Sequence, residues 1–213
     1  MDTKFILIRH GESVANATHK YAGHSDYELS PKGHQQAWAA AEYFKTEKLT
    51  AIYSSDLKRA YSTALPHSKL HAIPVIKSRE LREVYVGEWE DQYLSDIIER
   101  WPDEFCVEWR QKFGSSTPPG GESVYRAGKR MHDKLLSLAK EVDGKILIVA
   151  HAAVIRAFWC YFQGIEPLEA WAEFVPFPSN ASASLVGFDG ERFVPIKYSF
   201  DDYLSDKAFV TEA

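Results

Sequence analysis

The sequence predicts an α/β fold in which helices cover both faces of a mostly parallel central sheet, a three-layer α/β/α arrangement. Three observations support this prediction. Residues 5–8 are a continuous apolar run, and residues 145–150 are apolar after Lys145; such runs are typical of strands buried on both faces. Strand-like and helix-like segments alternate along most of the chain. The turn at Asp189-Gly190 joins two late strand-like segments, which predicts a hairpin that adds an antiparallel edge strand.

Local signals place the other elements. Ser30 and Pro31 are typical of an N-cap and a first helical residue, so we expect a helix to about residue 46. Ser55 or Asp56 is expected to cap a second helix that ends near residue 68. We also expect strands at 51–54, 74–76, 184–188 and 193–198 and a helix at 154–162. The 213 residues suit one domain, which we expect to span 1–213.

Residues 88–125 interrupt the alternation of strands and helices. Helical pieces and a turn-rich stretch replace the strands, and we interpret this segment as an excursion that forms a lid over one end of the sheet. Phe105, Trp109 and Phe113 recur every four residues and therefore share one helical face. They either pack against the body of the domain or form a wall for a ligand.

Composition excludes several classes of function. Hydrophobic residues make up 45% and charged residues 26% of the chain, which is ordinary for a globular protein. The net charge of −5 argues against general binding of nucleic acid or an acidic membrane. The distant pair Cys106 and Cys160 predicts neither a disulfide framework nor a zinc site. The apolar run near the start is too short for a signal or membrane segment, so we expect a cytoplasmic protein.

Two histidines and two arginines follow the expected strands. His10 comes directly after the first strand, next to Arg9, and His151 follows the strand at 145–150. Arg59 lies in the first turn of the helix after the strand at 51–54. The carboxyl ends of parallel strands share one edge of a sheet, where anions bind. Arginines donate paired hydrogen bonds to phosphate, and nearby cations keep an imidazole neutral and nucleophilic. This edge is therefore expected to bind a phosphate.

At this point the motifs identify a family. Residues 9–16, Arg-His-Gly-Glu-Ser-Val-Ala-Asn, resemble the signature of the histidine phosphatase superfamily, the phosphoglycerate-mutase-like proteins. The similarity continues at residues 21–23, at 54–60, and at Leu81-Arg82-Glu83. It also includes Gly87-Glu88-Trp89-Glu90, Pro119-Gly120-Gly121-Glu122-Ser123 and His151. The Gly-Glu-Trp-Glu motif resembles the phosphatase branch, which includes broad-specificity phosphatases, α-ribazole phosphatase and metal-independent phosphoserine phosphatase.

The resemblance implies a role for each matching residue. His10 would be the nucleophile that becomes phosphohistidine, and Glu83 the general acid and base. Phosphoryl oxygens would be held by Arg9, Arg59 and His151. Asn16 would either donate to the phosphate or cap a helix start. Substrate contacts are also expected from Ala22, Gly23 and Ala152. The implied reaction is hydrolysis of a small-molecule phosphomonoester without a metal or cofactor, by a monomer or a homodimer.

Departures from the family pattern leave alternatives open. Ala152-Ala153 stands where the family usually has glycine after the histidine, so the added methyl group would either narrow the pocket or conflict with a positive φ angle. Asp91 also replaces a usual glycine, which we expect a loop to tolerate. A cofactor-dependent phosphoglycerate mutase is an alternative, although the excursion has no adjacent arginines for a second anionic group. A non-catalytic module that binds phosphorylated ligands is another.

Overall fold

A six-stranded sheet forms the centre of the protein in the computed structural model, which describes residues 3–112, 117–165 and 175–204. The strand order is β3-β2-β4-β1-β5-β6. β3, β2, β4 and β1 are parallel, whereas β5 is antiparallel to both of its neighbours. The predicted hairpin, made of β5 and β6, thus supplies the antiparallel end of the sheet. β5 is the strand with the opposite direction, and β6 is the edge strand. The strands are β1 (Thr3–Arg9), β2 (Leu49–Ser55), β3 (Val75–Ser78), β4 (Lys145–Ala150), β5 (Ala183–Phe188) and β6 (Phe193–Phe200).

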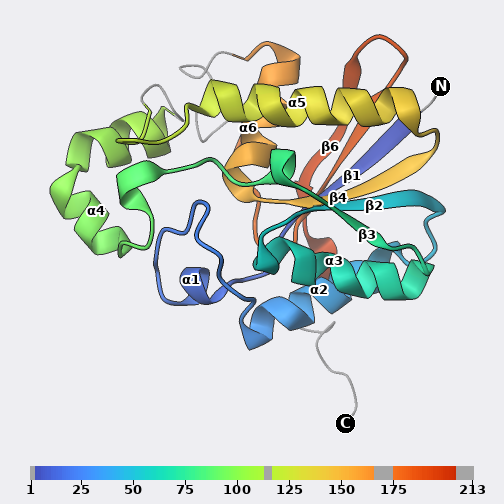
Figure 1. Cartoon of the computed structure of the whole chain (residues 1–213), viewed down its shortest axis with the longest axis horizontal. Coiled ribbons are helices and arrows are strands. Elements are labelled where there is room, and N and C mark those ends of the chain that lie inside the picture. Colours follow the sequence, from blue (N-terminus) through green and yellow to red (C-terminus); the bar gives the residue numbers. More distant parts are fainter. Residues whose placement is uncertain (1–2, 113–116, 166–174, 205–213) are drawn as a thin grey trace.

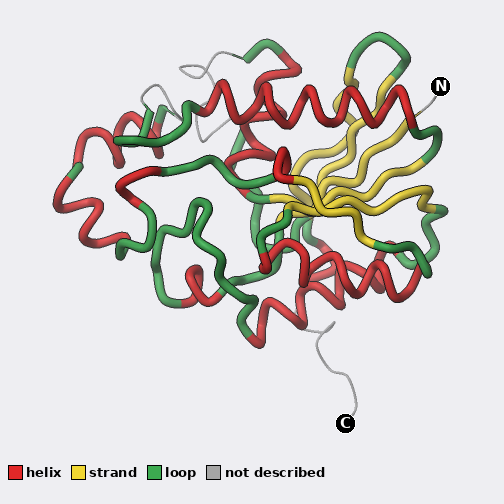
Figure 2. The backbone as a smooth tube through the Cα atoms, in the orientation of Figure 1, coloured by secondary structure: helices red, strands yellow, loops and turns green. Residues whose placement is uncertain are grey.

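Helices cover both faces of this sheet, which confirms the three layers. α2 (Pro31–Phe44) and α3 (Lys58–His71) lie together on one face, and α5 (Val124–Glu141) and α6 (Ala152–Gln163) on the other (Figure 1). Figure 2 shows the strands fanning between the two helical layers. The shorter helices are α1 (Val14–Ala17), η1 (Arg79–Leu81), η2 (Gly87–Trp89), α4 (Leu94–Arg100), the π-helix η3 (Pro102–Gln111) and η4 (Asp202–Leu204).

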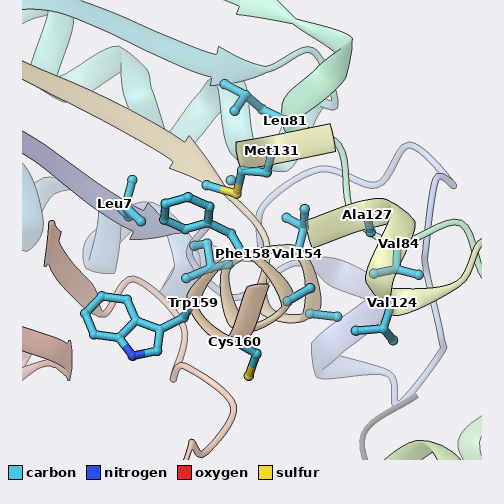
Figure 3. Packing of buried hydrophobic residues seen from close by; sticks show 14 of the residues in the cluster. Leu7, Leu81, Val84, Val124, Ala127, Met131, Val154, Phe158, Trp159 and Cys160 are labelled. Atoms are coloured by element: carbon cyan, nitrogen blue, oxygen red, sulfur yellow. The ribbon is translucent and has the colours of Figure 1, made fainter. Parts of the chain in front are cut away.

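The core is divided into two clusters by the sheet. Along β1, Phe5 and Leu7 belong to the cluster under α5 and α6, while Ile6 and Ile8 belong to the cluster under α2 and α3. This division follows from the alternation of side chains along a strand. Figure 3 shows the first cluster, in which Leu7 lies near Phe158 of α6. Because both faces of the middle of β1 are buried, residues 5–8 are apolar without interruption.

The start of α3 differs from the prediction. Neither Ser55 nor Asp56 is its N-cap, because the helix begins at Lys58. Instead, the carboxylate of Asp26 in a distant loop accepts a hydrogen bond from the backbone N–H of Lys58, over 2.7 Å. Asp56 forms a bidentate ion pair with Arg82, with both N···O distances at 2.6 Å. A cap supplied by a residue distant in sequence has no local signal.

Helix α5 was not among the elements expected from the sequence. Its buried residues include Ala127, Met131, Leu135 and Leu138, which recur at helical spacing, so the pattern was present in the sequence. Ser123 caps its start by accepting a hydrogen bond from the backbone N–H of Arg126. Gly128 lies where α5 crosses α6. A Cβ there would come within 2.6 Å of the carbonyl oxygen of Ala157, so the close crossing requires glycine.

The excursion at 88–125 consists of helical pieces, as predicted. Phe105 and Trp109 of η3 are buried, and their rings contact Trp89 at centroid distances of 5.2 and 5.7 Å. Packing is therefore confirmed for these two rings, whereas Phe113 lies outside the described residues. Asp91 has a φ angle of +62°, in the left-handed region that favours glycine and tolerates aspartate. This backbone angle explains why glycine suits that position.

Candidate active site

A cavity of about 320 Å³ lies at the carboxyl ends of β1 and β4. It brings together most of the residues that the sequence singled out. His151 is not part of the lining, but its ring is 5.1 Å from that of His10, centroid to centroid. The predicted site residues that line the cavity are Arg9, His10, Asn16, Ala22, Gly23, Arg59, Glu83 and Ala152.

The hydrogen bonds of His10 define its tautomer. Its Nδ1 lies 2.6 Å from the carbonyl oxygen of Gly11, which can only accept, so Nδ1 must carry the proton. The lone pair is therefore on Nε2, to which Nε of Arg59 donates over 3.3 Å. The two terminal nitrogens of Arg59 donate to the carbonyl oxygens of Ser25 and Gly23, both over 2.7 Å. The guanidinium is thus fixed beside the atom that would act as the nucleophile.

Two neighbours of His10, Arg9 in the sequence and His151 in space, contribute buried polar nitrogens to the site. Nε of Arg9 and both ring nitrogens of His151 are buried and have no hydrogen-bond partner among the described residues. Arg9 itself is anchored by its Nη1, which donates to the carbonyl oxygen of Pro178 over 2.6 Å. Buried polar groups without a partner are costly and uncommon in native proteins. An oxyanion beside His10 would accept hydrogen bonds from Nε of Arg9 and from the one N–H of the neutral His151 ring.

The charges of the site favour neutral histidines. Burial, followed by the charges of Arg59 and Arg9, holds the pKa of His10 well below its ordinary value. Burial and Arg59 likewise lower the pKa of His151. Burial lowers the pKa of Arg9 to about 10, with Glu83 opposing this shift, so Arg9 stays charged at neutral pH. The site therefore combines uncharged imidazoles with guanidinium cations, which suits attack on a phosphate.

Glu83 is held at the start of α6. Its carboxylate accepts hydrogen bonds from the backbone N–H groups of Ala153 and Val154, over 3.1 and 2.8 Å, and from Val84 over 2.9 Å. Ala152 is the first residue of α6 and is not among the residues with positive φ. The departure from glycine is therefore compatible with the backbone at this position.

Asn16 caps the short helix α1. Its Oδ1 accepts from the backbone N–H of Ser13 over 3.1 Å, and Ser13 Oγ accepts from the backbone N–H of Asn16. Nδ2 of Asn180 also donates to this oxygen and to the carbonyl oxygen of His10, both over 3.2 Å. These bonds fix Oδ1 as the acceptor, so the amide N–H₂ is the part of Asn16 available to a ligand in the cavity.

Gly23 is needed for its backbone. Its φ angle is +46°, and a Cβ there would lie 2.2 Å from Oε1 of Glu90. Glu90 accepts hydrogen bonds from the backbone N–H of His24 and from the hydroxyl of Ser25, which ties η2 to this loop. Nε2 of His24 lies 2.8 Å from the carbonyl oxygen of Glu83, so this loop also contacts the backbone of Glu83.

Several residues of the cavity were not assigned a role from the sequence. Tyr21 lines it and accepts a hydrogen bond from the indole N–H of Trp109. Burial raises the pKa of Tyr21, so its hydroxyl keeps its proton. Phe105 and Trp109 line the cavity as well as packing in the core, so both interpretations of these rings apply. The other lining residues without an assigned role include Lys20, Val86, Leu94, Arg110 and Phe177.

Within the described ranges, no group of three or more His, Cys, Asp or Glu side chains is arranged to hold a metal ion. None of the helices in those ranges combines the length and apolar character needed to cross a membrane. The cytoplasmic location and the possible homodimer remain predictions.

The chain matches a known family over most of its length. The family model of the histidine phosphatase superfamily (branch 1) matches residues 5–201. Phosphoserine phosphatase 1 of Hydrogenobacter thermophilus is 31% identical over 211 residues, covering 99% of this chain and 97% of that protein. Phosphoglycerate mutase-like protein 4 of Arabidopsis thaliana is 33% identical over 97% of this chain and 89% of its own.

A solved structure is similar over nearly its whole length. The mycobacterial glucosyl-3-phosphoglycerate phosphatase in complex with VO3 has a TM-score of 0.84 and 27% sequence identity. The match covers 93% of this chain and 99% of that one. The chain therefore belongs to the histidine phosphatase superfamily and has the fold of its phosphatases.

Proposed function

We propose that this chain hydrolyses small phosphomonoesters in two steps, through a phosphohistidine on His10. The observation that carries the proposal is the set of buried donors on Arg9 and His151, which have no partner in the described part of the chain. Arg9 lines the same cavity as His10, and the ring of His151 lies 5.1 Å from that of His10, whose Nε2 bears the lone pair. A phosphoryl group supplies the acceptor oxygens that these donors lack, and its phosphorus would lie in reach of Nε2.

In the first step, Nε2 of His10 attacks phosphorus and the bond from phosphorus to the ester oxygen breaks. Glu83, entering this step protonated, gives its proton to the leaving oxygen. In the second step, the carboxylate of Glu83 removes a proton from water, whose oxygen attacks phosphorus. The phosphorus–nitrogen bond breaks and returns its electron pair to Nε2, which releases inorganic phosphate. Arg9, Arg59 and His151 stabilise the phosphoryl oxygens in both steps.

The cavity favours a small substrate with an acidic organic half. A volume of about 320 Å³ is at the low end for ligand sites. Lys20 and Arg110 line it, so cations are present besides those that would bind the phosphate. The relatives include proteins named for phosphoserine and for glucosyl-3-phosphoglycerate, and both of these molecules carry a carboxylate. We therefore propose a phosphomonoester of the phosphoserine or phosphoglycerate type.

Trapping the intermediate tests the mechanism. The enzyme is mixed with ³²P-labelled phosphoserine for milliseconds and then quenched in alkali, which preserves phosphohistidine. We expect one label per chain at His10 and its loss on acid treatment. His10→Ala should show neither label nor hydrolysis. Undiminished hydrolysis by His10→Ala would overturn the mechanism. No hydrolysis of any phosphomonoester by the unmodified protein would instead favour the non-catalytic binding module.

Product analysis separates hydrolysis from mutase activity, which the mutase-like relative makes a specific alternative. The enzyme is incubated with 3-phosphoglycerate, and both 2-phosphoglycerate and inorganic phosphate are measured. We expect phosphate release to be the faster process. Isomer formation faster than phosphate release would assign the chain to the mutases instead.

A further inference from the structure

The loop that carries Glu83 is held by one side chain from the middle of α5. Nη1 of Arg130 donates to the carbonyl oxygens of Glu80 and Arg82, over 2.7 and 3.1 Å. Its Nη2 donates to the carbonyl oxygen of Glu83 itself, over 3.3 Å. A single guanidinium therefore contacts three carbonyl groups within four consecutive residues of η1 and the loop that follows.

Glu122 fixes the orientation of that guanidinium. Nε and Nη2 of Arg130 donate to the two carboxylate oxygens of Glu122, over 3.1 and 2.9 Å. Glu122 also pairs with the loop, because its backbone N–H donates to the carbonyl oxygen of Tyr85 over 2.7 Å and its Oε2 accepts from the N–H of Tyr85. The side chains of Arg130 and Glu122 are only 23% and 18% exposed. An ion pair shielded to this extent keeps one geometry better than a surface pair does.

Glu83 is thus held from two sides. Arg130 and His24 contact its backbone carbonyl, while the N-terminus of α6 holds its carboxylate. We propose that the Arg130–Glu122 pair is a positioning device that sets the carboxyl group of Glu83 for proton transfer to the leaving oxygen. Arg130 does not line the cavity, so it acts on the reaction through Glu83. This inference rests on the proposed role of Glu83 as the general acid.

Two substrates whose leaving groups differ in their need for a proton distinguish a misplaced acid from a general loss of stability, which would lower the activity on both. An alkyl phosphate such as glycerol phosphate needs protonation of its leaving oxygen, whereas p-nitrophenyl phosphate releases a stable anion and needs little. The quantity to compare is kcat/KM, since in a covalent two-step reaction it reports the steps up to the first release of product and leaves out hydrolysis of the phosphoenzyme. A misplaced Glu83 carboxyl group should therefore lower kcat/KM for the alkyl phosphate more than for p-nitrophenyl phosphate.

The variants are Arg130→Met, Arg130→Lys and Glu83→Gln, with Arg126→Met as the matched control. Arg126 lies one turn earlier on α5 and is exposed, with no side-chain bond to the loop in the described residues. We expect Arg130→Met to lower kcat/KM on the alkyl phosphate by about 10- to 100-fold, the loss that a small misplacement of a catalytic group causes. On p-nitrophenyl phosphate we expect a loss of less than about 3-fold, and Arg130→Lys should recover part of the activity because it keeps the charge.

Combination with Glu83→Gln tests whether Arg130 acts through Glu83. In that background, Arg130→Met should cause no further loss, because coupled residues are not additive. Equal losses on both substrates, or an undiminished effect in the Glu83→Gln background, would overturn the inference. If Glu83→Gln itself shows no dependence on the leaving group, the proposed acid role fails, whatever Arg130 does. Thermal unfolding identifies a variant that has lost its fold. If Arg130→Met is unfolded, the two substrates are compared with Arg130→Lys instead.

Discussion

The indole N–H of Trp109 donates a hydrogen bond to the hydroxyl oxygen of Tyr21 over 2.5 Å. Tyr21 belongs to the loop that follows α1, and Trp109 to the π-helix η3, so the bond joins two parts of the chain 88 residues apart. Both side chains line the cavity. The bond therefore holds η3, whose Phe105 and Trp109 line the cavity, in a fixed position relative to the residues that would bind phosphate.

Removing either partner of this bond should have the same effect. We expect Tyr21→Phe and Trp109→Phe each to lower kcat/KM for phosphoserine by about 3- to 10-fold, as expected for one hydrogen bond of roughly 1 kcal/mol. The double variant should be no worse than either single variant, because the same interaction is lost once. Steady-state kinetics on the four proteins measure this coupling. Additive losses would mean that the two residues act independently.

The pH dependence of the reaction follows from the pKa of His10. Burial and two arginines keep this pKa well below its ordinary value, so the imidazole stays neutral and nucleophilic in mildly acidic solution. A histidine with an ordinary pKa of about 6.5 would be only about 3% neutral at pH 5. We expect kcat/KM, corrected for ionisation of the substrate, to fall far less than that between pH 7 and pH 5. Arg59→Met should move the acid limb to higher pH, because it removes a cation that depresses this pKa. An acid limb near pH 6.5 in the unmodified enzyme would contradict the prediction.

Substitutions of Asn16 can separate its capping of α1 from its expected donation to phosphate. Asn16→Asp keeps an acceptor for the N–H of Ser13 but loses the amide donor and places a negative charge beside phosphate. We expect it to retain the thermal stability of the wild type and to lose at least about 10-fold in kcat/KM. Asn16→Ala should lose activity and also about 1 kcal/mol of stability through the cap. Full activity of Asn16→Asp would limit Asn16 to a capping role.

His67 makes the stability of the fold depend on pH. It is fully buried on α3 and neither ring nitrogen has a partner among the described residues. Burial, with a smaller effect of His71, lowers its pKa to about 3. Between pH 6.5 and 3 the unfolded state therefore binds a proton that the folded state does not, and stability falls as pH falls. From pH 7 to 5 the loss from this residue is about 2 kcal/mol.

Substitution isolates this contribution from those of the other buried histidines. His67→Leu should reduce the fall in unfolding free energy between pH 7 and pH 5 by about that amount, measured by urea denaturation. His34→Leu, on an exposed position of α2, is the control and should leave the pH dependence unchanged. An identical pH dependence of His67→Leu and wild type would mean that His67 is protonated in the folded protein.

The sequence predicted the parts of the site that depend on strands. Strand β4 was predicted with its observed bounds, Lys145–Ala150, and the positions of His10 and His151 follow from the rule that parallel strands end at one edge. Those signals are local and strong, because buried strands are apolar without interruption. Arg59 was placed at the same edge by the strand before its helix, whereas Glu83 was singled out only by the family motif.

The contacts between distant loops could not be predicted. Asp26 as the cap of α3, Asn180 beside Asn16, and Arg130 on the Glu83 loop are all side-chain contacts across the fold. Each contact depends on which distant segments of the chain meet in space, and a single sequence contains no signal for that. Helix α5 is different, because the helical spacing of its apolar residues is visible in the sequence and was sufficient to predict it.

Strands β1 and β4 are neighbours, and their last paired residues are Arg9 and Ala150, which directly precede the two histidines. The separation of the imidazoles is thus governed by the spacing between adjacent strands, about 4.8 Å, and by no loop. The walls that face the organic half of a ligand come from other segments, on either side of Tyr21 and in η3. Changes in those segments would consequently alter the shape of the cavity and leave the spacing of the two histidines unchanged.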